Sequence, residues 1–562
     1  MGKIITTIQN RFHEGMTNDR RNSYESSQNG VLIARPRASI IQNFDVLTAS
    51  SKMIPHYDDQ VDNTGNTEQL CMYLTYGATA KQYGLGVVSG TSRVKIFERA
   101  SLPQGAWGAS TSGQDSTNAR DEKVFIAYND GTSDLIFGLT GLRYIWQYNI
   151  TTPAFSGTLF DLTSYTNSAQ GLVHSKDDIL YLFIDNKVYK KNASAAFVLA
   201  LTLPVNSIIT SAWESGNYIA IATRSKGLGG KSYIYYWNRD SSFATLSEKV
   251  DGEYNDIRWG ESIAGYEIVC SVTTNTSITA RPKVIFSYVL GSGLKTIDEF
   301  NATNTTVLFG RNIQKINGRI YFMMNVEISG TVYMGLWSIG QNKQGQFAYC
   351  MEHQLNNGGT TFTASDSPKG FEILGDYVSI AYDIAGTFVA RMINKDVFSN
   401  NSDFESLIFN DGDSDLTKKL KGATVMFEPL STAGITGTPR VILSYKADGE
   451  ASFTQIFSFT SIAAGSFVVG NRYVILSVGT TDFTLIGASA NTIGVTFIAT
   501  GVGTGNGTAV FNSRVSHGAV NIESSGDPLP EYKEIEFRIQ SRGNAVITGL
   551  KWKSEIIDRV LY

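Results

Sequence analysis

A short acidic run holds the densest group of chemically capable side chains in the sequence. Asp411-Gly-Asp-Ser-Asp415 places three carboxylates within five residues. Because calcium prefers oxygen ligands, this run is a candidate cation site. It lacks the twelve-residue loop with a closing Glu that one large class of calcium sites uses. Two interpretations stay open, a bound cation and a solvated turn, and the missing pattern favours the turn.

Two glycine-rich segments come close to nucleotide-binding loops. One segment, Ser225-Lys-Gly-Leu-Gly-Gly-Lys-Ser232, differs from a phosphate-binding loop at one position, where Ser225 stands in place of the first glycine. The apolar strand pattern of Tyr233–Trp237 follows it. Such a loop needs a helix N-terminus after it to hold phosphate. The run Gly501–Gly507 has the wrong spacing for a dinucleotide fingerprint, and a short strand follows it as well. We interpret the first segment as a hairpin turn and assign no cofactor to either.

The residues that most often bind metals or form disulfides are few and scattered. The sequence has 3 cysteines and 5 histidines, and no CxxC, HxH or HExxH spacing occurs. Neither a zinc site nor a disulfide framework is therefore indicated. We expect the cysteines to be small buried hydrophobic residues. They are Cys71, Cys270 and Cys350.

Motifs of hydrolytic enzymes are also missing. The sequence has no GxSxG and no Ser-x-Asp-x-Gly-x-x-Trp box. Paired carboxylates for glycoside hydrolysis can come from distant strands, but nothing in the sequence points to such a pair. We expect a protein that is not an enzyme, with no catalytic residue, no cofactor and no metal.

The composition narrows the class of protein further. Charged residues make up 17% of the 562 residues, against about 25% in ordinary soluble domains. With a net charge of −4, the chain has no overall basic field to bind nucleic acid. Hydrophobic residues reach 42%, which excludes disorder for most of the chain. No apolar run approaches the roughly 20 residues of a membrane helix, so we expect no membrane span.

Between about residues 61 and 395 the pattern is β throughout and weakly repeated. A turn residue followed by an aromatic or aliphatic strand recurs at glycines 49, 53 and 57 residues apart, and a second aromatic strand usually follows 14 to 20 residues later. The glycines are Gly216, Gly265, Gly318 and Gly375. A period of about 40 to 57 residues built from four short strands is typical of a β-propeller blade. We predict six or seven blades, with a long β-sandwich or meander as the alternative.

The two ends of the chain differ from this repeat. Residues 1–60 lack sustained periodicity and predict an extended arm, ordered by a neighbouring subunit or else a frayed terminus. We predict that four arginines of this arm take part in interactions; the alternative is that they are ordinary solvated charges. Residues 396–460 and 513–562 predict the two halves of a C-terminal β-sandwich. The arginines are Arg20, Arg21, Arg35 and Arg37.

Between the sandwich halves the composition changes abruptly. Residues 461–512 contain one Arg and one Asp but nine glycines. This segment predicts a small inserted β-module. Its stretches Ala464–Tyr473, Ser477–Phe483, Ile486–Ser489 and Ala499–Thr508 closely resemble a small module found in virion proteins of tailed bacteriophages, which has no well-defined activity to transfer.

Two further segments resemble β-propeller tail proteins of bacteriophages. The arm, from Phe12–Arg21 to Ile41–Asp45 and Lys52–His56, is similar to their opening. The stretches Tyr532–Ile539 and Ile547–Trp552 are similar to their closing sandwich. In short-tailed phages such propellers form the nozzle or hub, usually as a six-fold ring beneath the portal and adaptor.

The resemblance implies a structural role in the virion. We expect a phage tail nozzle or hub protein, made in the host cytoplasm, whose copies form a homo-oligomer, a hexamer, around the DNA exit channel. Its expected partners are the adaptor or other tail proteins and the tail fibres, while viral DNA passes without specific binding. The alternative is a receptor-binding or glycan-degrading propeller, because propellers place variable loops on one face.

Overall fold

The structure is a computed structural model, and it describes the chain in segments. They are residues 4–9, 16, 24–28, 31–35, 38, 40–42, 44–45, 54–55, 57–62, 71–75, 81–87, 93–99, 111–115, 124–129, 134–140, 144–161, 171–192, 196–226, 231–250, 255–273, 283–289, 294–301, 308–328, 331–342, 345–355, 362–374, 377–384, 387–398, 402–427, 440–459, 461–511, 516–520, 530–543 and 545–557. Over these residues the chain is all-β, with one short 3₁₀ helix, η1 (Phe483–Ile486), so the predicted class is confirmed. No helix of the described segments is long and apolar enough to cross a membrane.

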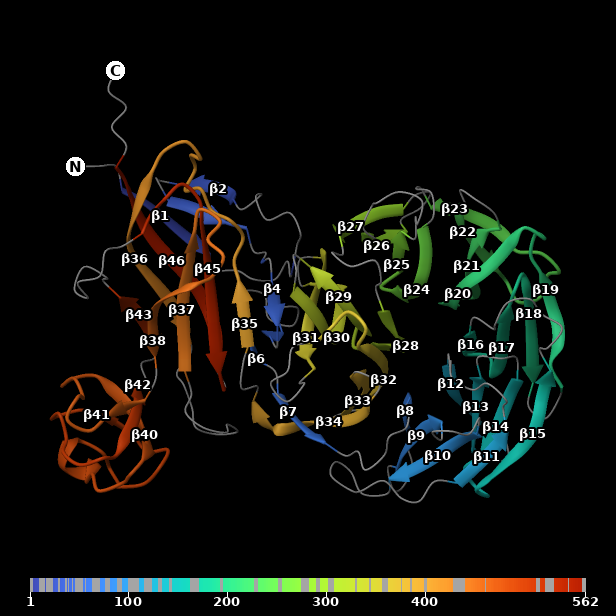
Figure 1. Cartoon of the computed structure of the whole chain (residues 1–562), viewed down its shortest axis with the longest axis horizontal. Coiled ribbons are helices and arrows are strands. Elements are labelled where there is room, and N and C mark those ends of the chain that lie inside the picture. Colours follow the sequence, from blue (N-terminus) through green and yellow to red (C-terminus); the bar gives the residue numbers. More distant parts are fainter. Residues whose placement is uncertain are drawn as a thin grey trace. The chain divides into compact units, whose positions relative to one another are not determined.

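The chain divides into two compact units. Unit 1 comprises residues 1–59, 337–354 and 394–562, and unit 2 comprises residues 60–336 and 355–393. Most of unit 2 consists of small sheets whose strands follow one another along the chain (Figure 1). We number these sheets 1 to 7 in chain order.

Sheets 1 to 5 each have four strands, and neighbouring strands are antiparallel. Sheet 1 has β8 (Cys71–Thr75), β9 (Lys81–Val87), β10 (Arg93–Arg99) and β11 (Thr111–Asp115), and sheet 2 has β12 (Val124–Asn129), β13 (Asp134–Thr140), β14 (Tyr144–Asn149) and β15 (Ala154–Asp161). Sheet 3 has β16 (Gly171–His174), β17 (Ile179–Ile184), β18 (Lys187–Asn192) and β19 (Val198–Thr202), and sheet 4 has β20 (Ser207–Ser215), β21 (Tyr218–Ser225), β22 (Ser232–Trp237) and β23 (Thr245–Val250). Sheet 5 has β24 (Asn255–Ile263), β25 (Tyr266–Thr273), β26 (Lys283–Val289) and β27 (Leu294–Asn301).

Sheets 6 and 7 continue the series with one difference each. In sheet 6, strand β31 pairs beside β30, and the division between the units falls inside β30. In sheet 7, the fourth strand is β7, which comes from before β8 in the sequence and pairs beside β34. The strands are β28 (Leu308–Ile316), β29 (Arg319–Ile328), β30 (Thr331–Gln341) and β31 (Phe347–Gln354); β32 (Ser367–Leu374), β33 (Tyr377–Ile384), β34 (Thr387–Phe398) and β7 (Tyr57–Asp62).

The hairpin turns confirm the spacing of the sequence repeat. Gly216, Gly265 and Gly318 all have positive φ and connect the first strand of a sheet to its second, in sheets 4, 5 and 6. This left-handed conformation is easy for glycine and allows the tight turns that match the twist of the strands. The fourth predicted glycine, Gly375, lies outside the described residues.

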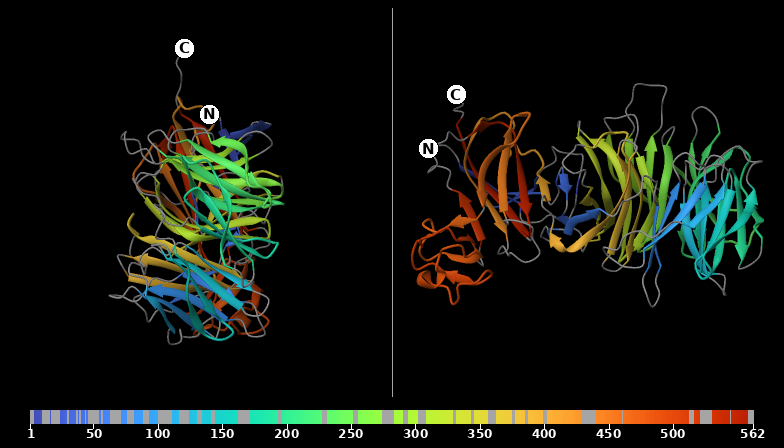
Figure 2. Two further views of the ribbon diagram at one scale, coloured as in Figure 1. Left: turned by 90° about the vertical axis from the view of Figure 1, so that its right-hand side faces the viewer. Right: turned by 60° about the horizontal axis from the view of Figure 1, so that its bottom comes forward.

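Consecutive sheets contact one another in a closed order, mostly through their first strands. Contacts run from β8 to β12, β16, β20 and β24, then from β24 to β29 of sheet 6, from β28 to β32, and from β32 back to β8. Figure 2 shows the same sheets as separate twisted groups of strands. Within unit 2, the series of sheets therefore returns to its beginning.

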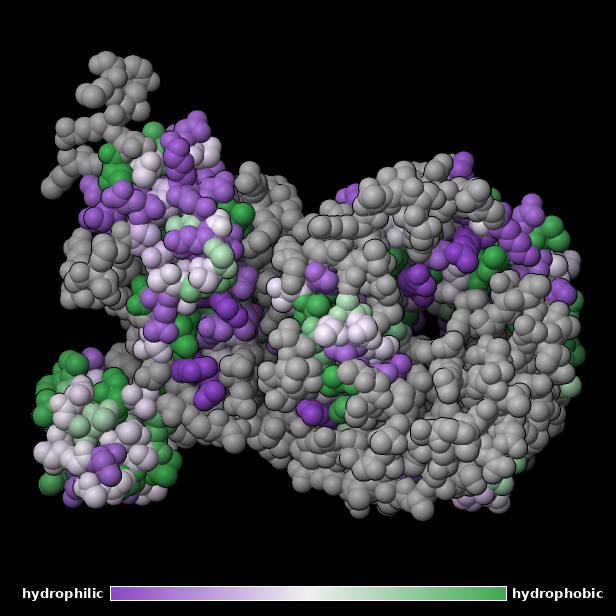
Figure 3. All heavy atoms as spheres, in the orientation of Figure 1, coloured by the Kyte–Doolittle hydropathy of each residue, from purple (hydrophilic) through white to green (hydrophobic). Residues whose placement is uncertain are grey.

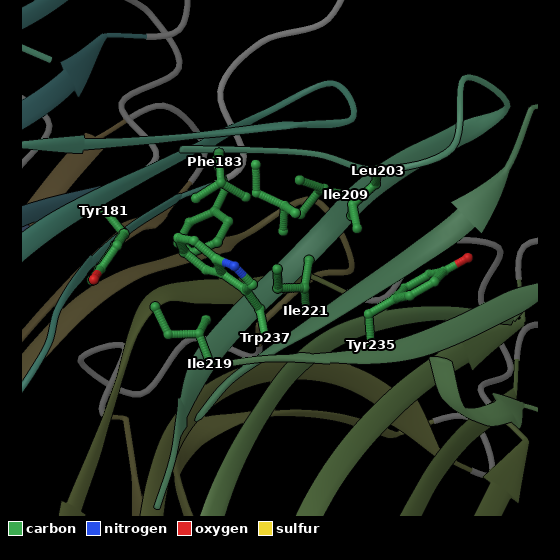
Figure 4. Close-up of a cluster of buried hydrophobic side chains, with 10 residues drawn as sticks. Tyr181, Phe183, Leu203, Ile209, Ile219, Ile221, Tyr235 and Trp237 are labelled. Atoms are coloured by element: carbon green, nitrogen blue, oxygen red, sulfur yellow. The ribbon is translucent and has the colours of Figure 1, made fainter. Parts of the chain in front are cut away.

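Apolar side chains fill the space between consecutive sheets. Between sheets 3 and 4, Trp237 packs edge-on against Tyr181, with ring centroids 5.5 Å apart, in a cluster of buried aliphatic residues (Figure 4). Between sheets 4 and 5, Trp213 packs beside Ile257. Gly260 lies against the same indole, where a Cβ atom would come 2.6 Å from the Trp213 ring. Only glycine lets β24 approach this closely.

Unit 1 contains two larger sheets. In the first, the strand order is β2-β3-β1-β46-β36-β43, with β44 beside β36; in the second, β31 is followed by β4-β35-β45-β37-β38. The indole of Trp552 on β46 packs 4.8 Å from the ring of Phe537 on β45, so the two sheets meet through aromatic contacts. Further strands are β1 (Ile4–Gln9), β2 (Tyr24–Gln28), β3 (Val31–Ala34), β4 (Ile40–Gln42), β5 (Phe44–Asp45), β6 (Ile54–Pro55), β35 (Ser402–Glu405), β36 (Lys418–Phe427), β37 (Arg440–Ala447), β38 (Thr454–Phe459), β43 (Ser516–Val520), β44 (Glu531–Tyr532), β45 (Ile535–Arg542) and β46 (Ile547–Ile556).

The N-terminal strands belong to these sheets. β1 pairs along its length with the C-terminal strand β46, and β4 pairs with β35. Two strands of the predicted arm of residues 1–60 are therefore paired with late strands of the same chain, whereas β2 and β3 pair with each other and β5 pairs with β6.

The predicted insert has a sheet and a core of its own. β39 (Ile462–Ala463), β40 (Arg472–Ser477), β41 (Thr496–Ile498) and β42 (Thr508–Phe511) form a sheet in the order β39-β42-β40-β41. The aromatic rings of Phe467, Tyr473, Phe483 and Phe497 pack together inside it. Pairing of Ile462 with Ala509 brings the ends of the segment together, as an insertion requires.

Candidate functional site

Of the four predicted interaction arginines, the structure describes one. Arg35 follows β3 and is partly buried, and its carbonyl oxygen accepts a hydrogen bond from Gln9 Nε2 at 3.1 Å. Arg20, Arg21 and Arg37 lie outside the described residues. The arginine surface therefore stays a prediction.

The acidic run 411–415 is divided between the interior and the surface of unit 1. Asp411 is buried, whereas Asp413 and Asp415 are exposed. The exposed part is a turn in which Asp413 Oδ1 accepts the backbone N–H of Asp415 at 2.9 Å. The interpretation as a solvated turn is therefore right for the exposed end and wrong for Asp411, because side chains distant in the sequence cover it.

Four side chains surround the buried carboxylate and donate hydrogen bonds to it. Thr7 Oγ1 and Trp552 Nε1 each lie 3.0 Å from Asp411 Oδ1. The Tyr532 hydroxyl, at 2.5 Å, and Ser554 Oγ, at 2.7 Å, donate to Oδ2. We call these five residues the Asp411 cluster. They come from β1, β44, β46 and the loop before β36, so the cluster connects N-terminal and C-terminal strands to the loop that carries Asp411.

The buried ammonium group of Lys418 lies beside this cluster. Lys418 Nζ donates to the carbonyl oxygens of Asp413 at 2.6 Å and Leu416 at 2.7 Å, and to that of Lys533 at 3.2 Å. It also lies 5.9 Å from the centroid of the Tyr532 ring. A buried ammonium group needs such acceptors to replace its hydration. The positive charge near Asp411 is thus supplied by Lys418. The described residues contain no group of three or more His, Cys, Asp or Glu that could hold a metal ion.

Polar side chains also connect the sheets of unit 2. Between sheets 3 and 4, Arg239 lies 2.8 Å from Glu214 and 3.5 Å from Asp177, and Glu214 also accepts the Lys176 N–H. Nearby, burial and the Asp177 charge raise the pKa of Tyr181 to about 12. Between sheets 4 and 5, Glu267 accepts hydrogen bonds from the Trp213 indole at 2.6 Å and from Ser215 at 2.5 Å. Sequence reasoning missed these residues, because the partners come from different repeats.

Sheets 6 and 7 are joined by side chains that bond to the neighbouring backbone. The Asn312 side chain bonds both to the N–H of Phe371, at 3.0 Å, and to its carbonyl oxygen, and Gln314 Oε1 accepts the N–H of Ile373 at 2.8 Å. Burial raises the pKa of Glu372, which lies between these two bonds on β32, to about 8. Between sheets 5 and 6, burial likewise raises the pKa of Glu261, and the Lys315 ammonium at 3.2 Å lowers it in part.

The remaining sequence motifs have structural places. In the segment 225–232, the Ser225 N–H donates to the Lys231 carbonyl at 2.9 Å, and the antiparallel pairing of β21 with β22 agrees with the predicted hairpin. The turn residues 227–230 lie outside the described residues. In the run 501–507, the Gly507 N–H donates to Thr481 Oγ1 at 2.8 Å within the insert, and β42 follows. Cys270 and Cys350 are buried as expected, while the side chain of Cys71 lies outside the described residues.

Comparison with known proteins gives no relative from which a function could be transferred. No protein family matches the sequence, and no curated protein is significantly similar to it.

Proposed function

We propose that sheets 1 to 7 form a seven-bladed β-propeller and that β7 completes its last blade. Two observations support this. The first strands contact one another in an order that returns from β32 to β8. The strand that completes sheet 7 comes from before sheet 1, which joins the end of the ring to its beginning. The two larger sheets of unit 1 then form the C-terminal β-sandwich.

We further propose that the protein is a structural component of a bacteriophage tail, a nozzle or hub. The observation that carries this proposal is the separate fold of the insert. Residues 464–509 resemble a virion module, and residues 461–511 have their own sheet and core. A module of this kind, inserted into a sandwich, fits a virion protein better than an enzyme.

The contacts inside each unit are those of a rigid structural subunit, as the wall of a ring requires. The propeller sheets are joined by apolar cores and by buried polar contacts such as Glu267 with Trp213. The Asp411 cluster fixes β1 to β46. In this proposal, copies of the chain form a hexameric ring around the DNA exit channel of the virion, in contact with adaptor, portal-side and fibre proteins. No catalytic residue, cofactor or metal is assigned.

Electron microscopy of the purified full-length protein tests the assembly. We expect six-fold rings with a central opening, and globular projections from the insert. A monomer at all concentrations, or a trimer, would contradict the nozzle proposal.

One observation favours the alternative of a receptor-binding or glycan-degrading propeller. Tyr218 is exposed, and its carbonyl oxygen lies 3.5 Å from Arg239, which also contacts Glu214. An exposed aromatic ring can stack on a sugar, and here the backbone of the same residue contacts a charged group. Glycan-array binding that is lost in both Tyr218→Ala and Glu214→Gln, but kept in Phe243→Ala, would favour this alternative over the nozzle.

A further inference from the structure

The insert exposes an unusual number of aliphatic side chains for its size. Leu485 is 79% exposed, and five more aliphatic residues of this segment are more than half exposed. Figure 3 shows few strongly hydrophilic residues on the visible face of this module, which carries β40 and β41. Exposed apolar patches of this kind mark interaction surfaces. The other five residues are Val468, Val469, Ile493, Ile498 and Val502.

Backbone hydrogen bonds bring most of these residues together. The Gly470 N–H donates to the Ala499 carbonyl, which places the Val468–Val469 loop beside Ile498. The Gly465 N–H donates to the Val502 carbonyl, and the Thr500 N–H donates to the carbonyl of Ile486, the residue after Leu485. These segments all surround residues 498–502. We call Val468, Val469, Leu485, Ile498 and Val502 the aliphatic patch.

Each of the two charges of the insert lies next to a residue of this patch. Arg472 on β40 is the register partner of Ile498 on β41, and both are exposed, so their side chains lie on the same side of the sheet. Asp482 is the N-cap of η1, where its carboxylate accepts hydrogen bonds from Thr484 N at 3.0 Å and Thr484 Oγ1 at 2.6 Å. Leu485 follows within the same turn. The patch thus has one positive and one negative neighbour.

The chemistry of the surface excludes several classes of partner. Nucleic acids and anionic membranes require several cations, and residues 461–512 contain one. The four aromatic rings of the module core are buried and cannot stack on a ligand. What remains is an apolar protein surface with one charge of each sign.

We propose that the aliphatic patch binds the same patch on a second copy of this chain. One positive and one negative charge beside an apolar patch are complementary to themselves under a two-fold rotation, because Arg472 of each copy then faces Asp482 of the other. No like charges need to meet, and both ion pairs form at once. The inference rests on the proposal that the chain assembles with itself. It adds a contact between pairs of copies and does not close a ring.

Sedimentation velocity of the full-length chain tests this contact. We expect Leu485→Asp to weaken the pairwise association at least tenfold. The control is Val205→Asp, since Val205 is 77% exposed but belongs to unit 2, in the connection between β19 and β20. It should associate like the wild type. Equal association of Leu485→Asp and wild type would overturn the proposal.

A charge exchange identifies the second copy as the occupant. Arg472→Asp alone brings four acidic side chains together in a pair, and Asp482→Lys alone brings four basic ones. Each variant should associate weakly by itself, whereas a mixture of the two restores both ion pairs and should associate as heterodimers. A mixture of the two folded variants that associates no more strongly than its components would overturn the proposal. Six-fold rings should persist in Leu485→Asp, because this contact does not close the ring. Rings in both proteins together with equal pairwise association would leave the nozzle proposal intact and contradict this contact alone.

Discussion

The indole Nε1 of Trp552 donates a hydrogen bond to Oδ1 of Asp411 at 3.0 Å, although the two residues are 141 positions apart. The same oxygen accepts the hydroxyl of Thr7, from the opposite end of the chain. The cluster thus makes the pairing of β1 with β46 depend on one buried carboxylate. This dependence gives the first prediction.

Asp411→Ala should destabilise unit 1 by about 3 kcal/mol or more, because it leaves four buried donors without their acceptor. Hydrogen exchange of peptides covering β1 and β46 should accelerate, while exchange in sheets 3 and 4 stays unchanged. Asp415→Ala is the matched control. Its carboxylate is exposed in the same loop, so the change should stay within about 0.5 kcal/mol. Equal effects of the two variants would contradict the role of the cluster.

Gly260→Ala should destabilise the joint between sheets 4 and 5 by about 1–3 kcal/mol, because the new methyl group overlaps the Trp213 ring. Trp213 must move, so hydrogen exchange of β20 and β24 is the measurement. Gly171→Ala provides the comparison, since nothing lies within 4 Å of its added Cβ. An unaffected Gly260→Ala would show that the two sheets are not held this close.

Glu372 should make the joint between sheets 6 and 7 sensitive to pH. Its folded-state pKa is raised from 4.5 to about 8 by burial, so the folded protein keeps a proton that the unfolded chain has lost. Stability should therefore fall as pH rises from about 4.5 to about 8 and level off above that. Thermal unfolding at pH 5 and pH 8 should show a smaller loss in Glu372→Gln than in the wild type. Glu299→Gln, at an exposed ion pair, should behave like the wild type; no difference among the three proteins would contradict the prediction.

Asn312→Ala should loosen sheet 7 from sheet 6, because it leaves the N–H and carbonyl of Phe371 without their side-chain partner. The expected cost is about 1–3 kcal/mol. Faster exchange of peptides from β32, with no change in β16, is the expected signature. Gln341→Ala removes an exposed bond to the Gly345 carbonyl and should leave β32 unchanged.

The local parts of the fold could be predicted from the sequence, and the distant contacts could not. Gly216 and the aromatic strand after it form a local pattern, and the predicted turn and strand are both present. The pairing of β1 with β46 depends on residues more than 500 positions apart, and short strands carry no signal of their partner. The burial of Asp411 could not be predicted for the same reason, because its hydrogen-bond donors are residues 7, 532, 552 and 554. Arg239 and Glu214 of sheet 4 look like ordinary surface charges in the sequence, because their partners Asp177 and Lys176 come from sheet 3.

Cryo-electron microscopy of the intact virion, with antibody fragments against the insert, tests the central proposal most directly. We expect six copies in a ring around the DNA channel at the tail, with the antibody bound outside the ring. Labelling of trimeric fibres alone, or virions that contain no copy of the chain, would contradict it.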